Sequence, residues 1–223
     1  QGAQHPGMGH ELYRVNRVFR SAIDRCEEIL GDRLEVPLTE LLDPDGQRAE
    51  LIHRTDLTQP ALFAVQYALT EVWTSWGVRP SVVLGHSIGE FAAAYVAGAF
   101  SAEDALHLVV ARGRAMHAVH REGRMLAVMA PEPRVGEWVE QVGGDLSIAA
   151  VNAPTQVVVS GATERVAEVE ALASAAAVTT RTLRTSHAFH SPLMEGALPE
   201  MEAALSGIEL TPADRVRFIS TVT

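Results

Sequence analysis

Apolar and polar positions follow two different periods along the chain, and each period predicts one type of element. Residues 11–30 carry apolar side chains at helical spacing. A longer helix is predicted to begin near Thr58 as its cap, with Pro60 in its first turn and Gly77 at its end. The three β-favouring residues 82–84 then predict a buried strand. The first half of the chain therefore predicts helices packed around a strand.

From residue 125 the pattern changes to short strands alternating with helices. The predicted strands are 125–129, 146–151, 156–160 and 178–183, and the predicted helices are 135–142 and 165–177. This β-α-β-β-α-β order is typical of a ferredoxin-like unit. We therefore predict an α/β fold with two domains. A large α/β-hydrolase-like domain with a parallel sheet comprises 1–124 and 185–223, and a small ferredoxin-like α+β domain, 125–184, is inserted into it.

Composition narrows the class of protein. The 223 residues are 47% apolar, which suffices for one large core or for one domain with an insert. No run of about 18 uncharged apolar residues predicts a membrane span. No signal peptide is visible, and the single cysteine, Cys26, excludes an internal disulfide, so a cytoplasmic protein is expected. The net charge of −10 argues against nucleic acid as the main partner.

The segment from Gly85 to Gly89 carries the first candidate chemistry. Its residues, Gly-His-Ser-Ile-Gly, follow the predicted strand and precede a predicted helix, which is the context of a G-x-S-x-G nucleophile elbow. Both glycines are expected because strand and helix should come closest at those two positions. Ser87 would then lie at a helix N-terminus, where free N–H groups stabilise an oxyanion. The pattern predicts Ser87 as a nucleophile.

Two further groups have the chemistry to assist such a nucleophile. Arg112 falls in a largely apolar predicted helix, where a buried guanidinium needs an anionic partner, either a structural salt bridge or a substrate carboxylate. His187 and His190 lie three residues apart, just before a proline that opens a helix. They lack a third ligand nearby for zinc, so no metal site is predicted. A general base for Ser87 is the better interpretation.

In this order and spacing, the motifs resemble the acyltransferase domain of modular type I polyketide synthases, and more broadly the malonyl-CoA:acyl carrier protein transacylases. The matching segments are 1–4 (QGAQ), 58–62 (TQPAL), 85–90 (GHSIGE), 112–114 (RGR), 152–154 (NAP), 187–190 (HAFH) and 220–223 (STVT). The family's first strand precedes the position of Gln1, and its large domain is completed by a segment after Thr223. The resemblance therefore implies that the natural polypeptide extends beyond both ends and that the large domain is incomplete here.

The resemblance implies a ping-pong acyl transfer with Ser87 and His190 as the catalytic residues. Ser87, activated by His190, would attack the thioester of malonyl-CoA. The backbone N–H groups of Gln1 and Ile88 would form the oxyanion hole, and Arg112 would bind the free carboxylate of the malonyl group.

Substrate selection is implied for another set of side chains. His187, Phe189 and Ile88 would favour malonyl over methylmalonyl, because Phe189 would fill the space that an α-methyl group needs. Gln59 and His86 would support the site.

The expected partners follow from the same resemblance. The malonyl group would pass to the phosphopantetheine thiol of an acyl carrier protein, beside neighbouring ketosynthase and linker domains, and no bound cofactor, nucleic acid or membrane is expected. Three alternatives remain open at this point. They are a malonyl transacylase of fatty acid synthesis, a serine hydrolase or thioesterase with Ser87, His190 and Asp145, and a non-catalytic docking module.

Overall fold

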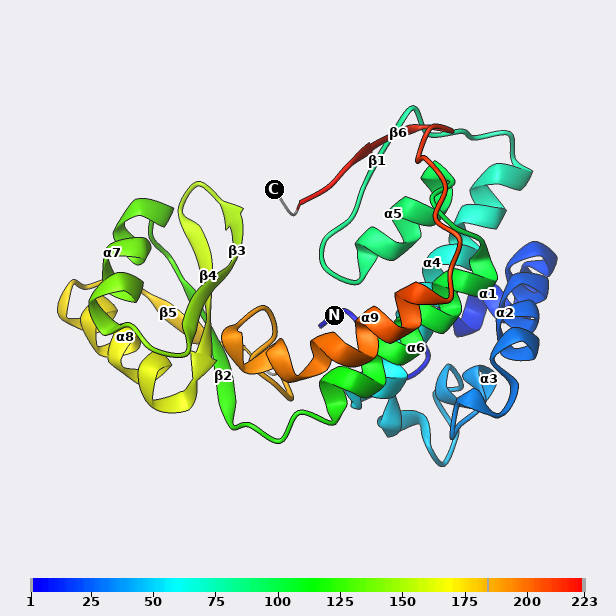
Figure 1. Cartoon of the computed structure of the whole chain (residues 1–223). Helices are drawn as coiled ribbons and strands as arrows, with labels where there is room; N and C mark the ends of the chain where they lie inside the picture. The colour runs from blue at the N-terminus through cyan, green and yellow to red at the C-terminus, as the bar shows by residue number, and fades with distance from the viewer. Residues whose placement is uncertain (1, 184, 222–223) are drawn as a thin grey trace. The chain divides into compact units, whose positions relative to one another are not determined.

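The chain divides by its internal contacts into two compact units (Figure 1). The computed structural model describes residues 2–183 and 185–221. The large unit comprises Ala3–Ala115 together with the described residues from Pro199 onward, and the small unit comprises Met116–Leu198. The small unit thus extends beyond the 125–184 expected for the inserted domain, although the assignment of domains itself stays a prediction.

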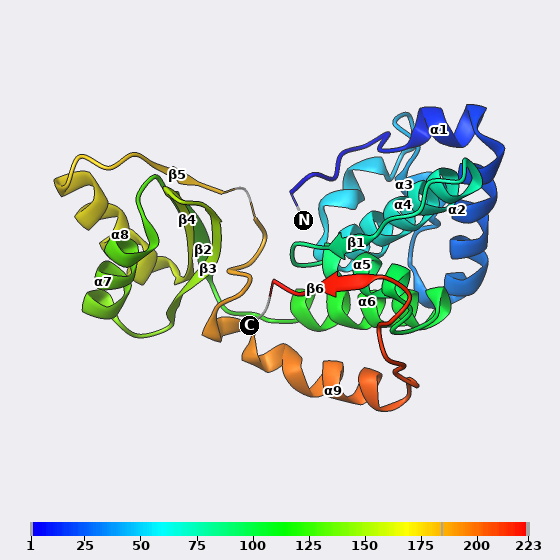
Figure 2. The ribbon, with the colours of Figure 1, turned by 90° about the horizontal axis from the view of Figure 1, so that it is seen from above.

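The large unit is built mostly from helices. They are α1 (His10–Val15), α2 (Arg17–Leu30), η1 (Gly31–Arg33), α3 (Leu38–Leu41), η2 (Ala49–His53), α4 (Thr55–Ser75), α5 (Gly89–Ala97), α6 (Ala102–His117) and α9 (Leu198–Ser206). The core forms around α4, which contacts α2 and α5 and lies beside both in Figure 2. Phe19 and Ile23 of α2 and Phe63 of α4 are fully buried in this core, so the predicted helical period is confirmed over α2. The range 11–30 is divided at Asn16, and α1 buries none of its residues.

The start of α4 differs from the prediction. The helix begins at Thr55, and its N-cap is Arg54, not Thr58. Thr58 is buried inside the helix, where its hydroxyl donates to the carbonyls of Ile52 at 2.5 Å and Arg54 at 2.8 Å. Pro60 lies beyond the first turn. The prediction was wrong because a threonine can cap a helix from its first position, whereas the Thr58 hydroxyl lies within the helix and hydrogen-bonds to backbone carbonyls of the residues before it.

A parallel strand pair precedes the predicted elbow. Strand β1 (Val82–Leu84) pairs in parallel with β6 (Arg217–Ile219), with Val82 opposite Arg217, which confirms a parallel sheet. The expected burial of β1 is wrong, because the Leu84 side chain is 65% exposed. Within the described residues, β1 and β6 form a two-stranded sheet, so β6 is the one strand that pairs with β1 there.

The small unit has the predicted element order. It contains β2 (Gly123–Val128), α7 (Glu132–Val142), β3 (Leu146–Ala153), β4 (Gln156–Ala162), α8 (Thr163–Ala175), β5 (Thr180–Thr182) and η3 (Pro192–Ala197). Its four-stranded sheet has the order β3-β4-β2-β5, and every pair is antiparallel.

The two faces of this sheet are covered differently. Leu126 and Val159 face α7 and α8 in one apolar cluster. Met125 and Val158 face the opposite way and pack against residues of 188–194 in a second cluster. This packing explains why the small unit includes residues well past 184.

Among the residues that the structure describes, none of the helices combines the length and apolar character needed to cross a membrane.

Candidate active site

The chain makes the predicted sharp turn between β1 and α5. Ser87 has a φ of 53°, a left-handed backbone that costs an L-residue about 1–3 kcal/mol. A Cβ at Gly85 would come within 2.2 Å of the Gly89 carbonyl carbon, so this position requires glycine. At Gly89 the nearest atom to an added Cβ would be Gln66 Nε2 at 3.9 Å, so the crowding expected there is wrong. The close approach constrains Gly85 alone.

The guanidinium of Arg112, on α6, lies beside this serine. Its Nη2 is 3.5 Å from Ser87 Oγ, and its Nη1 donates to Gln59 Oε1 at 2.7 Å. Gln59 is fully buried on α4, so the amide is held in place. The Arg112 guanidinium also stacks 5.8 Å from the centre of the Phe91 ring.

The charge of Arg112 has no acidic partner within the described part of the chain, where the ion pairs involve other residues. Burial lowers the pKa of Arg112 to about 10, which still leaves the guanidinium positively charged near neutral pH. The structural salt bridge considered from the sequence is therefore not formed by any described residue. A carboxylate arriving beside Ser87 would meet a partly desolvated cation and gain charge-assisted hydrogen bonds.

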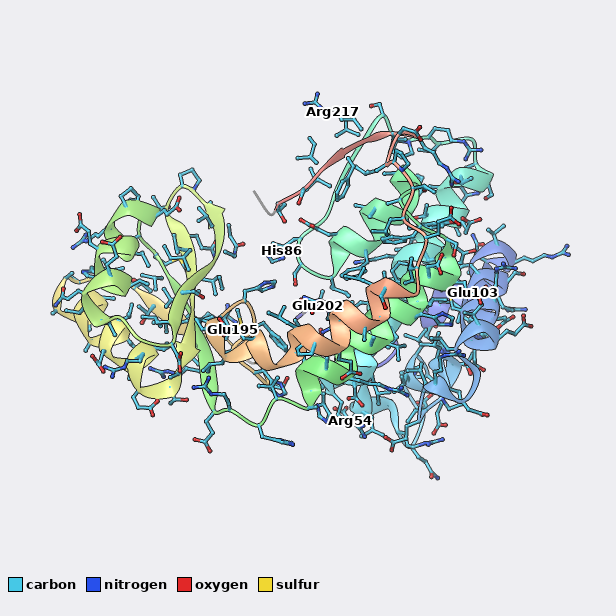
Figure 3. All side chains as sticks on the ribbon, in the orientation of Figure 1. Arg54, His86, Glu103, Glu195, Glu202 and Arg217 are labelled. Carbon is cyan, nitrogen blue, oxygen red and sulfur yellow. The ribbon has the colours of Figure 1, made fainter. Side chains whose placement is uncertain are left out.

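The backbone N–H of Ile88 also belongs to this part of the site. Ile88 is the N-cap of α5 and is 2% exposed, and no described residue accepts a hydrogen bond from its N–H. Gln1, the other predicted oxyanion donor, lies outside the described residues. His86 lies on the exposed side of the same turn (Figure 3).

A contact that the sequence analysis missed ties the turn to β6. The Glu90 carboxylate, in the first turn of α5, accepts the Thr221 N–H at 2.7 Å and also the Thr221 hydroxyl. The same hydroxyl lies 3.3 Å from the Gly85 carbonyl. Both residues lie in segments that resemble family motifs, but they are 131 residues apart, and the sequence pattern does not indicate that they are hydrogen-bonded.

The predicted base, His190, lies in the small unit in the turn before η3. It is exposed and has a φ of 58°. Its backbone carbonyl accepts a hydrogen bond from Ser147 Oγ at 2.6 Å. The Ser191 hydroxyl donates to the Ala188 carbonyl at 2.7 Å and closes the turn.

The neighbouring motif residues lie in the same unit. His187 Nδ1 is 2.9 Å from Ser186 Oγ, and the His187 ring lies 6.1 Å from the His117 ring and 5.8 Å from the Phe189 ring. Burial, and then the nearby charge of His117, lower the pKa of His187. Phe189 is only 6% exposed and packs in the second apolar cluster.

The structure thus groups the predicted residues into two sets. Ser87, Ile88, Arg112 and Gln59 lie together in the large unit, and the residues of 187–190 lie together in the small unit. The pairing of Ser87 with His190 stays a prediction.

Two other groups bear on the alternatives. The Asp145 carboxylate, the acid considered for a hydrolase, pairs with Arg121 at 2.6 Å and makes no described contact with His190. Among the described residues there is no group of three or more His, Cys, Asp or Glu side chains placed to hold a metal ion.

Comparison with known proteins gives one consistent result. The family model for the acyl transferase domain matches residues 1–223. The spectinabilin polyketide synthase system protein NorB of Streptomyces orinoci is 44% identical over 225 residues, which cover all of this chain and 10% of that protein.

Solved structures agree. The acyltransferase domain from the second module of the salinomycin polyketide synthase matches with a TM-score of 0.93 and 43% identity, over 100% of this chain and 51% of the other. The loading acyltransferase of the avermectin modular polyketide synthase matches with a TM-score of 0.88 and 38% identity, over 100% of this chain and 70% of the other. The chain therefore spans a small part of its curated relative and about half of the first of these structures.

Proposed function

Because the chain belongs to the acyl transferase domain family, we propose that it transfers malonyl groups within a polyketide synthase. Ser87 takes the malonyl group from malonyl-CoA and passes it to the phosphopantetheine thiol of an acyl carrier protein. The named relatives are polyketide synthases or acyltransferases of such synthases, which favours this role over a transacylase of fatty acid synthesis.

The observation that carries the proposal is the position of Arg112. Its charged guanidinium is partly buried, lies 3.5 Å from Ser87 Oγ and has no described acidic partner. A substrate with a free carboxylate supplies that partner. One charge-assisted hydrogen bond is worth about 1.5–3 kcal/mol, which favours malonyl over acetyl by an order of magnitude or more. A serine hydrolase has no comparable use for this arginine.

In the first half-reaction, Ser87 Oγ attacks the thioester carbonyl carbon of malonyl-CoA while His190 accepts the hydroxyl proton. The Ile88 N–H, with that of Gln1, stabilises the negatively charged oxygen of the tetrahedral intermediate. The carbon–sulfur bond then breaks, and the CoA thiolate takes the proton from His190. The product is a malonyl ester on Ser87.

In the second half-reaction, the phosphopantetheine thiol attacks the ester carbonyl and gives its proton to His190. The carbon–oxygen bond to Ser87 breaks, and the serine regains a proton from His190. Water must be excluded while the ester waits, because hydrolysis competes with transfer.

We attribute the choice of extender unit to the side chains of 187–190. Phe189 is buried against Met125 and Val158, so its ring has little freedom to move aside for an α-methyl group. His187 contacts this ring, and Ile88 follows the nucleophile directly. Since one methyl group is worth only about 1–3 kcal/mol, some methylmalonyl should still be accepted.

We interpret the large unit as α/β-hydrolase-like, since β1 leads into the elbow and α5. We interpret the small unit as ferredoxin-like, since its sheet order is β3-β4-β2-β5 and its two helices pack on one face. As part of a synthase, the domain would act beside ketosynthase and linker domains in the cytoplasm.

The intact mass of the protein after mixing with malonyl-, methylmalonyl- or acetyl-CoA tests this function. We expect one malonyl adduct, a smaller amount of methylmalonyl adduct, little acetyl adduct, and none of them on Ser87→Ala. The malonyl adduct should persist until a carrier protein is added. An adduct that survives in Ser87→Ala refutes the proposed nucleophile, and an adduct lost rapidly to water indicates a hydrolase.

A further inference from the structure

We propose that Ser147, on β3, is a positioning residue that holds the turn carrying His190 in its active conformation. This inference rests on the proposed function. It concerns a residue of the small unit outside the motif residues of 187–190, and it follows from contacts within that unit.

The backbone at His190 needs an external support. A φ of 58° is costly for a residue with a side chain, by about 1–3 kcal/mol, and persists only where neighbouring groups enforce it. Ser147 Oγ donates to the His190 carbonyl at 2.6 Å and so fixes the plane of the peptide that follows the histidine. His190 itself is exposed to solvent, and this hydrogen bond reaches it from a strand of the sheet.

The sheet supplies a rigid base for this hydrogen bond. Ser147 pairs across the strands with Ser160 of β4, and Ser160 pairs with Met125 of β2. Cross-strand partners point to the same face of a sheet, so Ser147 lies on the face that carries Met125 and Val158. This is the face on which the segment 188–194 packs.

The approach of that segment to the sheet is close. A Cβ at Gly123 of β2 would lie 2.7 Å from both Ala188 Cβ and Leu193 Cδ1. The absence of a side chain at Gly123 therefore gives these two residues, which flank the turn, room to pack against the sheet. Ala188 and Leu193 are buried there, which anchors the turn on either side of His190. These apolar contacts fix the position of the turn. They are not directional, whereas the hydrogen bonds from Ser191 Oγ to the Ala188 carbonyl and from Ser147 Oγ to the His190 carbonyl are, and only the one from Ser147 links the exposed centre of the turn to the sheet among the hydrogen bonds described here.

The sheet also offers a matched control. Ser160 is fully buried on the same face, and its hydroxyl has no hydrogen-bond partner within the described part of the chain. Ser160→Ala therefore removes a hydroxyl from the neighbouring strand without removing a hydrogen bond, whereas Ser147→Ala removes the bond to His190. Ser147→Thr keeps the hydroxyl and suits a strand, because threonine is β-branched.

The test uses the full chain in single-turnover acylation with malonyl-CoA, followed by rapid quenching and intact mass. For Ser147→Ala we expect the rate constant to fall about fivefold to tenfold, with the final amount of acyl-enzyme unchanged. Ser147→Thr should recover most of the rate, and Ser160→Ala should match the wild type. A lower final amount at a normal rate constant would mean that the variant only lost folded protein, and this would overturn the positioning role.

A double-mutant cycle asks whether Ser147 acts through His190. In the His190→Ala background, the rate constant of the slow residual acylation should not change when Ser147 is also replaced by alanine. An equal loss in both backgrounds, or a full rate in Ser147→Ala alone, would overturn the inference while leaving the proposed function intact. Wild-type protein that forms no malonyl adduct would instead overturn the proposed function, and the role of Ser147 in transfer would fall with it.

Discussion

Replacement of Arg112 by alanine tests the central feature of the proposed site. The variant removes the cation beside Ser87 but leaves the nucleophile and the turn in place. Malonyl transfer should therefore fall, while transfer of acetyl, which has no free carboxylate, should change little. The informative quantity is the ratio of kcat/KM for malonyl-CoA to kcat/KM for acetyl-CoA.

The size of the effect follows from the contacts. Nη1 of Arg112 already donates to Gln59 at 2.7 Å, so Nη2, the nitrogen nearest Ser87, is the donor most available to a substrate. One charge-assisted hydrogen bond in a partly desolvated site is worth about 2–3 kcal/mol, which corresponds to roughly 30- to 150-fold. Acetyl transfer should stay within about threefold of the wild type, since no bond to the substrate is lost.

A second arginine of α6 provides the control. Arg114 lies two residues further along α6, is exposed and contacts the Arg33 carbonyl, so Arg114→Ala should leave both substrates unaffected. The Arg112 variant removes the hydrogen bond from Arg112 Nη1 to the buried Gln59 oxygen. Thermal unfolding should therefore be measured for this variant and for Arg112→Lys, which keeps a cation. A parallel fall for malonyl and acetyl, or an unchanged ratio, would refute the carboxylate role of Arg112.

Three further predictions concern the small unit and the buried core. Phe189→Ser combined with His187→Tyr should raise methylmalonyl turnover relative to malonyl in a competition assay, because the ring volume is removed; an unchanged ratio would contradict the steric explanation. Burial raises the pKa of the Cys26 thiol to about 12, so iodoacetamide should modify this residue only after denaturation, and rapid labelling of native protein would contradict its burial. The pKa of His187 is lowered below its ordinary 6.5, so its contribution to stability is complete above about pH 6.5 and is lost as the pH falls through the lower folded pKa. In urea unfolding, the free energy of unfolding of His187→Gln should therefore fall less on acidification than that of the wild type. An equal fall in both proteins would exclude His187 as a cause of the loss of stability in acid.

The local chemistry of the elbow could be predicted from the sequence because its determinants lie within five residues. The steric need for Gly85, the left-handed Ser87 and the helix that follows depend on neighbouring backbone atoms. The same locality explains why the element order of the small unit was predicted. The predicted helix start at Thr58 was wrong, because a polar side chain inside a helix can also hydrogen-bond to the backbone of another segment.

The partners of the candidate site could not be predicted in the same way. Arg112 and Gln59 are 53 residues apart, and Ser147 and His190 are 43 residues apart. A sequence indicates which of these side chains carry the chemistry, since nucleophile, base and cation are properties of residue type. Only the folded chain brings a particular amide to a particular guanidinium.

The sequence by itself determined the periodicity of the helices, the turn around Ser87 and the candidate residues, since all of these follow from steric and chemical properties of short segments. The tertiary structure decided the lack of a described acidic partner for Arg112, the link from Glu90 to Thr221 and the hydrogen bond from Ser147 to His190. The physical reason is that burial and hydrogen bonding each require two groups in contact, and the fold determines which groups distant in the sequence come into contact.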